Sequence, residues 1–311
     1  MKQAFVFPGQ GSQAVGMGKA LAGAFPAARD VFGEVDEALK QSLARLMFEG
    51  PEDQLTLTEN AQPALMAVSM AVMRVLAVDG HFDLGQSAAF VAGHSLGEYS
   101  ALAAAEALSL ADVARLLKVR GSAMQEATPV GIGAMAAILA LDFEAVASIA
   151  EEAAAGEVCA AANDNAPGQV VVSGHRAAVE RAIALAAERG ARRAVLLQVS
   201  APFHCILMEP AAKRMAEALA ETTLHAPVVP VVSNVKAEAV SDPAEIRDLL
   251  VKQVTGTVRW RESVQWMKRQ GVERLVEAGA GKVLAGLAKR IDGDLAAVSL
   301  NTPADIEAFL K

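Results

Sequence analysis

Apolar and amphipathic stretches alternate along the whole chain. Short apolar runs that suit buried β-strands occur at residues 4–7, 88–92, 228–233, 274–276 and 296–299. Longer segments with apolar residues at helical spacing lie between them, at residues 27–39, 61–78, 109–124, 243–254, 260–270 and 282–290. Strands that alternate with helices in this way predict an α/β fold built on a mostly parallel sheet.

The middle of the chain follows a different order. Beyond a break at residues 128–133, strand-like runs (134–139, 158–162, 169–173, 193–197), helical runs (143–155, 177–189) and a polar loop (163–168) give the order βαββαβ. This is the ferredoxin-like arrangement. We therefore predict a large α/β-hydrolase-like domain, discontinuous over residues 1–128 and 199–311, with a small ferredoxin-like subdomain inserted at residues 129–198.

The composition narrows the class of protein. Of 311 residues, 53% are hydrophobic and 21% are charged, which is typical of a compact globular protein. The net charge of −8 argues against nucleic acid or an anionic membrane as partner. The two cysteines, Cys159 and Cys205, lack the spacing of a metal site and suit a reducing cytoplasm. Polar residues and a proline interrupt the apolar segment 61–78, which we interpret as a buried helix of a cytoplasmic protein.

The strongest chemical signal is the pattern Gly-His-Ser-Leu-Gly at residues 93–97. It directly follows the apolar run 88–92 and precedes an alanine-rich helical segment. A nucleophile elbow requires this strand–turn–helix context, because glycines permit a sharp turn that larger side chains would obstruct. We therefore predict that Ser95 is a nucleophile; an ordinary serine at a helix N-terminus is the alternative.

A serine hydroxyl needs a neighbouring base, and histidine suits that task best near neutral pH. His204 lies at a strand-to-helix turn where its ring could face a cleft. His81, His175 and His225 suit surface positions, and the ring of His94 is expected to point away from the adjacent serine. We therefore predict that His204 is the base, with a structural histidine as the alternative.

A third member of a catalytic triad is not evident from the sequence. Asp164 is the only attractive acid between Ser95 and His204, but it lies within the predicted small subdomain. The order serine, acid, histidine of the α/β-hydrolases also places the histidine late in the chain. A Ser–His dyad, with the imidazole oriented by a backbone carbonyl, fits the sequence better.

Two further patterns have alternative interpretations. The pattern Gly-x-Gly-x-x-Ala at residues 9–14 follows a strand, as a dinucleotide-binding fingerprint would, but Pro8 intervenes and the acid at the required distance, Asp30, lies in a helical pattern. We interpret this loop as a source of backbone N–H groups for an oxyanion. Arg120 is either an exposed arginine near a helix C-terminus or a bidentate clamp for a substrate carboxylate.

Together these motifs resemble those of the malonyl-CoA:acyl carrier protein transacylases, the bacterial acyltransferases of fatty-acid synthesis. Similar stretches occur in the same order nearly from end to end, at residues 7–13, 93–101, 120–121, 133–137, 167–171, 204–205 and 281–284. The resemblance implies ping-pong transfer of a malonyl group from malonyl-CoA to the pantetheine thiol of acyl carrier protein, through an ester on Ser95. It implies no metal and no cofactor apart from the phosphopantetheine of the partner, and we expect a monomer.

The resemblance also implies roles for single residues in the reaction. Ser95 is the nucleophile and His204 its general base and acid. The main-chain carbonyl of Gln253 orients the imidazole of His204. The backbone N–H groups of Gln10 and Leu96 form the oxyanion hole.

Substrate binding falls, by the same resemblance, to four other residues. Arg120 binds the malonyl carboxylate, and Met124 and Asn163 help to line the pocket. Phe203 departs from the serine that bacterial members commonly have before the active-site histidine. Polyketide-synthase acyltransferases that select malonyl over methylmalonyl resemble this chain in having phenylalanine there, and its ring would crowd an α-methyl branch.

Other classes of protein remain as alternatives. A serine esterase or thioesterase on an α/β-hydrolase fold would discharge its acyl-enzyme to water and would need an acid such as Asp164. A non-catalytic carrier-binding protein would show no turnover. Within acyl transfer, a trans-acting polyketide acyltransferase is the alternative to an enzyme of fatty-acid synthesis.

Overall fold

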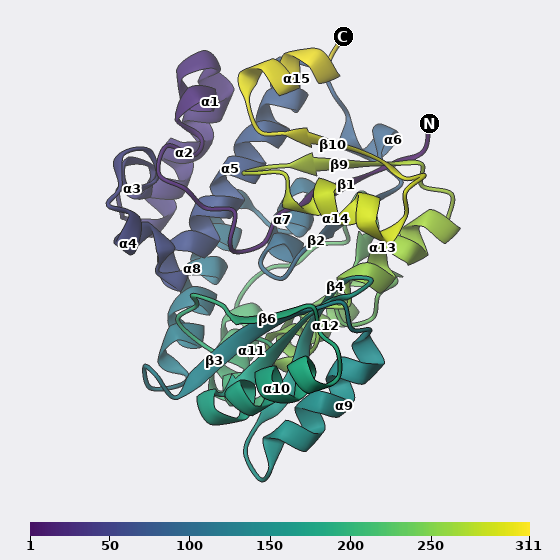
Figure 1. Cartoon of the computed structure of the whole chain (residues 1–311). Coiled ribbons are helices and arrows are strands. Elements are labelled where there is room, and N and C mark those ends of the chain that lie inside the picture. The colour runs from purple at the N-terminus through teal and green to yellow at the C-terminus, as the bar shows by residue number, and fades with distance from the viewer.

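Two β-sheets organise the chain in the computed structural model, which describes residues 1–311 (Figure 1). In the larger sheet the strand order is β10-β9-β1-β2-β7-β8, and neighbours are parallel except for β7 and β8. Its strands are β1 (Gln3–Phe7), β2 (Phe90–Gly93), β7 (Val231–Val232), β8 (Ala239–Val240), β9 (Arg274–Ala278) and β10 (Ala296–Leu300). The predicted mostly parallel sheet is therefore confirmed.

Helices cover both faces of this sheet. Phe5 and Phe7 of β1 belong to the same apolar core as residues of α2, α5 and α8, whereas Ala4 and Val6 belong to a second core with residues of α13 and α14. Successive side chains of a strand point to opposite faces, so a strand buried on both sides is apolar at every position. The helices outside the middle segment are α1 (Lys19–Ala24), α2 (Pro26–Leu39), α3 (Leu43–Glu49), α4 (Glu52–Thr56), α5 (Thr58–Val78), α6 (Leu84–Ser87), α7 (Gly97–Ala104), α8 (Leu110–Glu126), α11 (Glu209–Ala220), α12 (Pro243–Thr255), α13 (Trp260–Arg269), α14 (Val283–Ile291), α15 (Pro303–Phe309) and the 3₁₀ turn Ile206–Met208.

The second sheet is antiparallel and is formed by the middle of the chain, which occupies the lower part of Figure 1. Its elements follow the predicted βαββαβ order and its strands lie in the order β4-β5-β3-β6. One face packs Ala136 and Ile138 against the two helices. The opposite face carries Met135 and Val171, which line a cavity between this sheet and the β2–α7 turn. The elements are β3 (Gly133–Leu139), α9 (Phe143–Ala154), β4 (Cys159–Ala166), β5 (Gln169–His175), α10 (Arg176–Glu188) and β6 (Arg193–Leu196).

One prediction for this segment is wrong. The polar stretch 163–168 was predicted as a loop, but β4 continues through residue 166. The backbone N–H of Asp164 donates to the carbonyl of Val258 at 2.9 Å, and the Nε of Arg261 donates to both carboxylate oxygens of Asp164 at 2.9 and 3.0 Å. A distant arginine thus compensates the charge of a buried strand residue, which local strand propensity cannot reveal.

In the larger sheet, between β2 and the edge strand β8, the predicted strand 228–233 is shorter than expected. Only Val231 and Val232 pair with neighbouring strands. Pro227 and Pro230 have no N–H to donate to a strand ladder, which limits the pairing to the residues that follow them.

The most apolar long helix is α5. By length and composition it could cross a membrane, but 78% of its most apolar window is buried inside the protein. It packs against α2, α7 and α8, as expected of a core helix. Its one arginine, Arg74, lies toward the surface and pairs with Glu34 at 3.0 Å.

Candidate active site

The turn at residues 93–97 joins β2 to α7 and holds Ser95 in a left-handed conformation, with φ of +53°. A Cβ atom on Gly93 would lie 1.9 Å from the carbonyl of Gly97, and one on Gly97 would lie 2.3 Å from the carbonyl oxygen of Phe7. Both positions therefore need glycine, because backbone approaches backbone too closely for a side chain. A strained serine held by tight packing is the geometry of a nucleophile elbow.

The close packing of this turn predicts that Gly93→Ala lowers the free energy of unfolding by roughly 3 kcal/mol, since the new methyl group must displace the start of α7. Urea denaturation measures the change. Gly33→Ala, on the exposed side of α2 with no atom within 4 Å of the new Cβ, is the matched control and is expected to be neutral or up to about 1 kcal/mol more stable. Equal stability of Gly93→Ala and the unmodified protein would contradict this account of the turn.

Ser95 and His204 lie in direct contact. The Oγ of Ser95 is 2.7 Å from the Nε2 of His204, and the Nδ1 of His204 is 2.9 Å from the main-chain oxygen of Gln253. A carbonyl only accepts, so Nδ1 carries the proton and Nε2 is free to accept from the serine hydroxyl. Burial and the nearby charge of Arg120 lower the pKa of His204 to about 3, which keeps the imidazole neutral.

Two backbone N–H groups beside the serine have no acceptor in the structure, those of Gln10 and Leu96. Both residues line the same cavity as Ser95. Leu96 precedes the first turn of α7, where the partial positive charge of a helix N-terminus adds to the attraction of these N–H groups for a negatively charged oxygen. The N–H of Ser95 itself is occupied, because it donates to the Oδ1 of Asn234 at 2.7 Å.

Arg120 lies inside the site, with only 1% of its surface exposed. Its Nη1 donates to the Oε1 of Gln62 at 2.8 Å, and its Nη2 donates to the Oε1 of Gln253 at 2.8 Å and to the Oγ of Ser95 at 3.1 Å. The alternative of an exposed arginine near a helix C-terminus is therefore wrong. All three acceptors are neutral and no carboxylate forms a salt bridge with Arg120, although a buried charge is stable only when compensated.

The other residues predicted to bind the substrate lie around Ser95 and His204. Met124, Asn163 and Phe203 are buried and line a cavity of about 340 Å³ together with Ser95 and His204. The remaining lining residues are Gln10, Gly11, Gln13, Gln62, His94, Leu96, Arg120, Met135, Asn165, Val171, Leu197, Gln198 and Val199.

Asp164 does not line this cavity and makes no contact with His204. Its carboxylate pairs with Arg261, and the Nδ1 of His204 is occupied by a backbone carbonyl. His94 lines the cavity, but its Nε2 bonds to the Oδ1 of Asn165 at 2.8 Å and not to Ser95. No group of three or more His, Cys, Asp or Glu side chains is placed to hold a metal ion.

Three residues of the site were missed from the sequence: Gln62, Glu98 and Asn234. Gln62 is a buried amide, 1% exposed, in an otherwise largely apolar helix, and a polar side chain in that pattern was a usable signal. Glu98 follows the elbow directly and is 1% exposed. Asn234 follows β7 and bonds with both Ser95 and Gly93, which are about 140 residues earlier in the chain. No local sequence pattern predicts such a contact.

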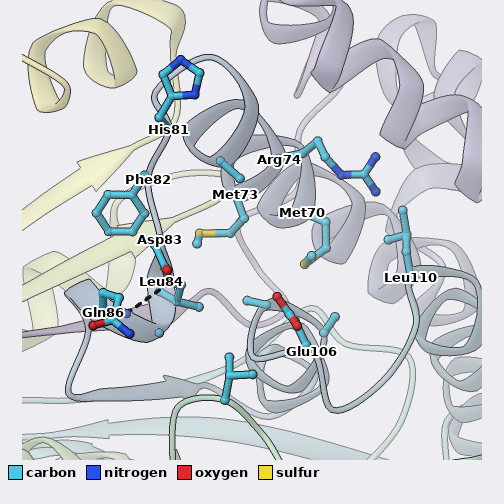
Figure 2. A pocket seen from close by; sticks show the side chains of 15 residues that line it. Met70, Met73, Arg74, His81, Phe82, Asp83, Leu84, Gln86, Glu106 and Leu110 are labelled. Atoms are coloured by element: carbon cyan, nitrogen blue, oxygen red, sulfur yellow. Dashed lines mark hydrogen bonds between the residues drawn. The ribbon is translucent and has the colours of Figure 1, made fainter.

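A larger cavity, of about 910 Å³, lies elsewhere (Figure 2). Residues of α5, of the segment around α6 and of the end of α7 line it, among them Met70, Met73 and Phe82. Its lining contains His81 but no serine, threonine or cysteine, so it lacks the pairing of a hydroxyl or thiol nucleophile with a histidine that the smaller cavity has.

Comparison with known proteins agrees with this geometry. A model of the acyl transferase domain family matches residues 4–289. The chain belongs to the acyl transferase family. Within that family, the malonyl CoA-acyl carrier protein transacylase of Escherichia coli (strain K12) is 49% identical over 308 residues, which span 99% of this chain and 98% of the relative.

Solved structures of acyl transferase family members are also similar over the whole chain. The acyl-carrier-protein-S-malonyltransferase from Bartonella henselae is 55% identical, with a TM-score of 0.97 covering 100% of this chain and 98% of that one. A malonyl-transacylase in complex with its type II PKS acyl-carrier protein is 43% identical, with a TM-score of 0.96 covering 100% and 99% of the two chains. The resemblance predicted from the motifs is thus confirmed.

Proposed function

We propose that this protein transfers the malonyl group of malonyl-CoA to the pantetheine thiol of acyl carrier protein, for fatty-acid synthesis. One observation carries the proposal: a buried guanidinium without a carboxylate partner donates to the hydroxyl of a serine that also bonds to a neutral histidine. The serine and histidine suit acyl transfer, and the guanidinium suits an acyl group that ends in a carboxylate. The names of the relatives agree with this substrate and this partner.

In the first half-reaction, His204 takes the proton of Ser95 while Oγ attacks the thioester carbonyl of malonyl-CoA. The negative charge of the tetrahedral intermediate falls on the former carbonyl oxygen, where the N–H groups of Gln10 and Leu96 are available to donate. Two such fixed donors contribute several kcal/mol to transition-state stabilisation. The carbon–sulfur bond then breaks, and His204 returns the proton to the departing thiolate of CoA.

The second half-reaction reverses these steps with a different thiol. His204 deprotonates the pantetheine thiol of the carrier protein, whose sulfur attacks the malonyl ester. The carbon–oxygen bond breaks, the proton passes from His204 to Ser95, and malonyl-carrier protein leaves. Throughout, the carbonyl of Gln253 keeps Nδ1 protonated and so directs Nε2 toward the reacting atoms.

Selection of the malonyl group falls to Arg120 and to the walls of the cavity. In the free protein, the guanidinium donates to Ser95 Oγ; a bound carboxylate offers two charged acceptors in its place. Phe203 and Met124 supply apolar walls and Asn163 a polar one. The ring of Phe203, next to His204, disfavours a branch on the α-carbon.

The serine hydrolase alternative has less support. The imidazole of His204 is oriented by a neutral carbonyl, and Asp164 is committed to Arg261, so no acid completes a triad. A trans-acting polyketide acyltransferase would use the same residues as the proposed enzyme, and the chemistry of the site favours neither pathway.

We extend the proposal to the architecture and setting of the molecule. The strand order β4-β5-β3-β6 supports a ferredoxin-like subdomain over residues 129–198, inserted into an α/β-hydrolase-like domain of residues 1–128 and 199–311. The net charge and the two free, buried cysteines support a cytoplasmic protein with no nucleic-acid or membrane partner. We infer a monomer that acts without a metal or bound cofactor.

The decisive experiment mixes the protein with malonyl-CoA and follows it by intact-mass spectrometry. We expect one malonyl adduct on Ser95 that persists for minutes and disappears, with the label recovered on the carrier protein, when holo acyl carrier protein is added. Fast release of CoA without an adduct would indicate hydrolysis, and no release of CoA would indicate a non-catalytic protein. Apo carrier protein, which lacks the thiol, is the matched control.

A further inference from the structure

Glu98 is a buried carboxylate behind the active site that the mechanism above does not use. It lies in the first turn of α7 and is 1% exposed. Its Oε2 accepts from the Nε2 of Gln253 at 2.8 Å and from the backbone N–H of Asn234 at 3.1 Å. No arginine, lysine or histidine forms a salt bridge with it. Burying a carboxylate that does not contact a cation costs free energy, so the position of Glu98 requires an explanation.

The side chain of Gln253 connects this carboxylate to Arg120. Its Nε2 donates to Glu98 and to the main-chain oxygen of Ser95, while its Oε1 accepts from Arg120. The amide dipole therefore points its positive end at the anion and its negative end at the cation. Glu98 and Arg120 form one anion–amide–cation unit with a net charge of zero, and the amide keeps the two charges apart.

We propose that Glu98 is a positioning residue for malonyl selectivity, whose charge, relayed through Gln253, weakens the hold of Arg120 on the substrate carboxylate. The inference rests on the proposed function. When a malonyl carboxylate enters the site, the positive charge of Arg120 is already partly compensated by Glu98. The negative charge of Glu98 also repels the incoming carboxylate. Like charges in a shared, buried site disfavour ionised carboxylates. Weaker binding favours release, because the carboxylate must leave with the acyl group when it passes to the carrier protein.

Among the ionisable groups of this network, Glu98 is the one whose pKa lies near neutral pH. Burial raises the pKa of Glu98 to about 7, against the opposing effects of Gln253, Asn234 and Arg120. Burial raises the pKa of Tyr99 on the same helix to about 12, so that phenol stays neutral.

The other titratable groups near the network do not change charge in this range. Burial lowers the pKa of His204 to about 3 and also lowers that of His94, so both imidazoles stay neutral. Arg120 remains a cation because a guanidinium does not deprotonate at neutral pH. The net charge of the unit is therefore zero above about pH 7 and +1 below it.

The sign of the effect follows from these charges. Protonation of Glu98 leaves Arg120 uncompensated, so the affinity for a malonyl carboxylate rises as pH falls through about 7. By linkage, binding of malonyl must in turn raise the pKa of Glu98 and draw a proton from solution. Acetyl-CoA carries the same nucleotide but no carboxylate, and it responds to neither effect.

The test measures dissociation constants of malonyl-CoA and acetyl-CoA by isothermal titration calorimetry in the Ser95→Ala background, where no turnover occurs. We expect the preference for malonyl over acetyl to be about tenfold greater at about pH 5.5 than at about pH 8.5. In Ser95→Ala/Glu98→Gln the preference stays high at both pH values. Glutamine keeps the size and the acceptor of Glu98, and the buried Ser233 hydroxyl, which has no other partner, can receive its N–H.

Proton uptake on binding supplies a second readout. At about pH 7, in buffers of different ionisation enthalpy, malonyl-CoA is expected to take up a fraction of a proton more than acetyl-CoA does, and Glu98→Gln is expected to abolish the difference. Glu277→Gln is the matched control. Glu277 is also a buried carboxylate, but it caps the start of α14 through the N–H groups of Leu284 and Ala285 and lies outside the cavity.

The outcomes separate this inference from the proposed function. A malonyl preference that is independent of pH and of Glu98→Gln, or that falls in Glu98→Gln, would overturn the role of Glu98 and leave the function standing. Equal affinity for malonyl-CoA and acetyl-CoA in every variant would instead overturn the proposed function.

Discussion

Replacing Ser95 with alanine is expected to lower malonyl transfer to acyl carrier protein by about 10⁴- to 10⁶-fold, the cost of removing a nucleophile from a serine enzyme. The loss should fall on the turnover rate. The Oγ of Ser95 accepts from Arg120, lies 2.7 Å from the Nε2 of His204 and carries the acyl ester. The walls of the cavity remain in the variant. Transfer of labelled malonyl from CoA to the carrier protein measures the loss.

A matched control for Ser95→Ala is Ser122→Ala on α8. The hydroxyl of Ser122 donates to the Oε2 of Glu59 at 3.2 Å, and Ser122 does not line the cavity. Ser122→Ala is expected to keep full activity. If Ser95→Ala retained more than about one per cent of the rate, another nucleophile would be at work and the elbow would have a structural role only.

Replacing Arg120 with alanine is expected to lower kcat/KM for malonyl-CoA by about 10²-fold. The charge-assisted bonds that it would make to the substrate carboxylate are worth about 1.5–3 kcal/mol, which corresponds to roughly 10- to 150-fold. Transfer of acetyl from acetyl-CoA, which has no carboxylate, is expected to change only a few-fold. The selectivity for malonyl over acetyl is therefore the quantity to measure.

Arg115 provides the control for Arg120. It lies on the same helix, but its side chain is 57% exposed and pairs with Asp112 at the surface, so Arg115→Ala is expected to leave the selectivity unchanged. Equal losses on malonyl and acetyl in Arg120→Ala would show that the guanidinium supports the fold of the site and does not bind the substrate carboxylate.

Much of the fold was predictable because it depends on local pattern. Residues 4–7 of β1 are all apolar because helices cover both faces of its sheet, and the helical spacing of the apolar residues of α2, α5 and α8 is visible in the sequence itself. The extent of β4 was not predictable. Its polar residues lie in a strand only because Val258 and Arg261, nearly 100 residues later, satisfy the backbone and the carboxylate of Asp164.

The sequence alone determined the elbow, because its two glycines, its serine and the flanking strand and helix patterns are local, and the close contact that requires Gly93 forms within a few residues of Ser95. The contact that requires Gly97 is with Phe7 and comes only from the packing of β1 beside the turn. The sequence also singled out His204 and favoured a dyad. It left Arg120 open between an exposed side chain and a clamp, since helical position does not say what packs against a helix. Only the tertiary structure decided that question, by bringing Gln62 from α5 and Gln253 from α12 onto one guanidinium.

The same holds for the network behind the site. Glu98, Asn234 and Gln253 come from three separate segments, and the sequence predicted a role only for the main-chain carbonyl of Gln253. Their hydrogen bonds join atoms up to 158 residues apart in the chain. Local sequence determines how a turn or helix is built, whereas the charge balance of a buried site depends on which side chains the packed elements bring within hydrogen-bonding distance.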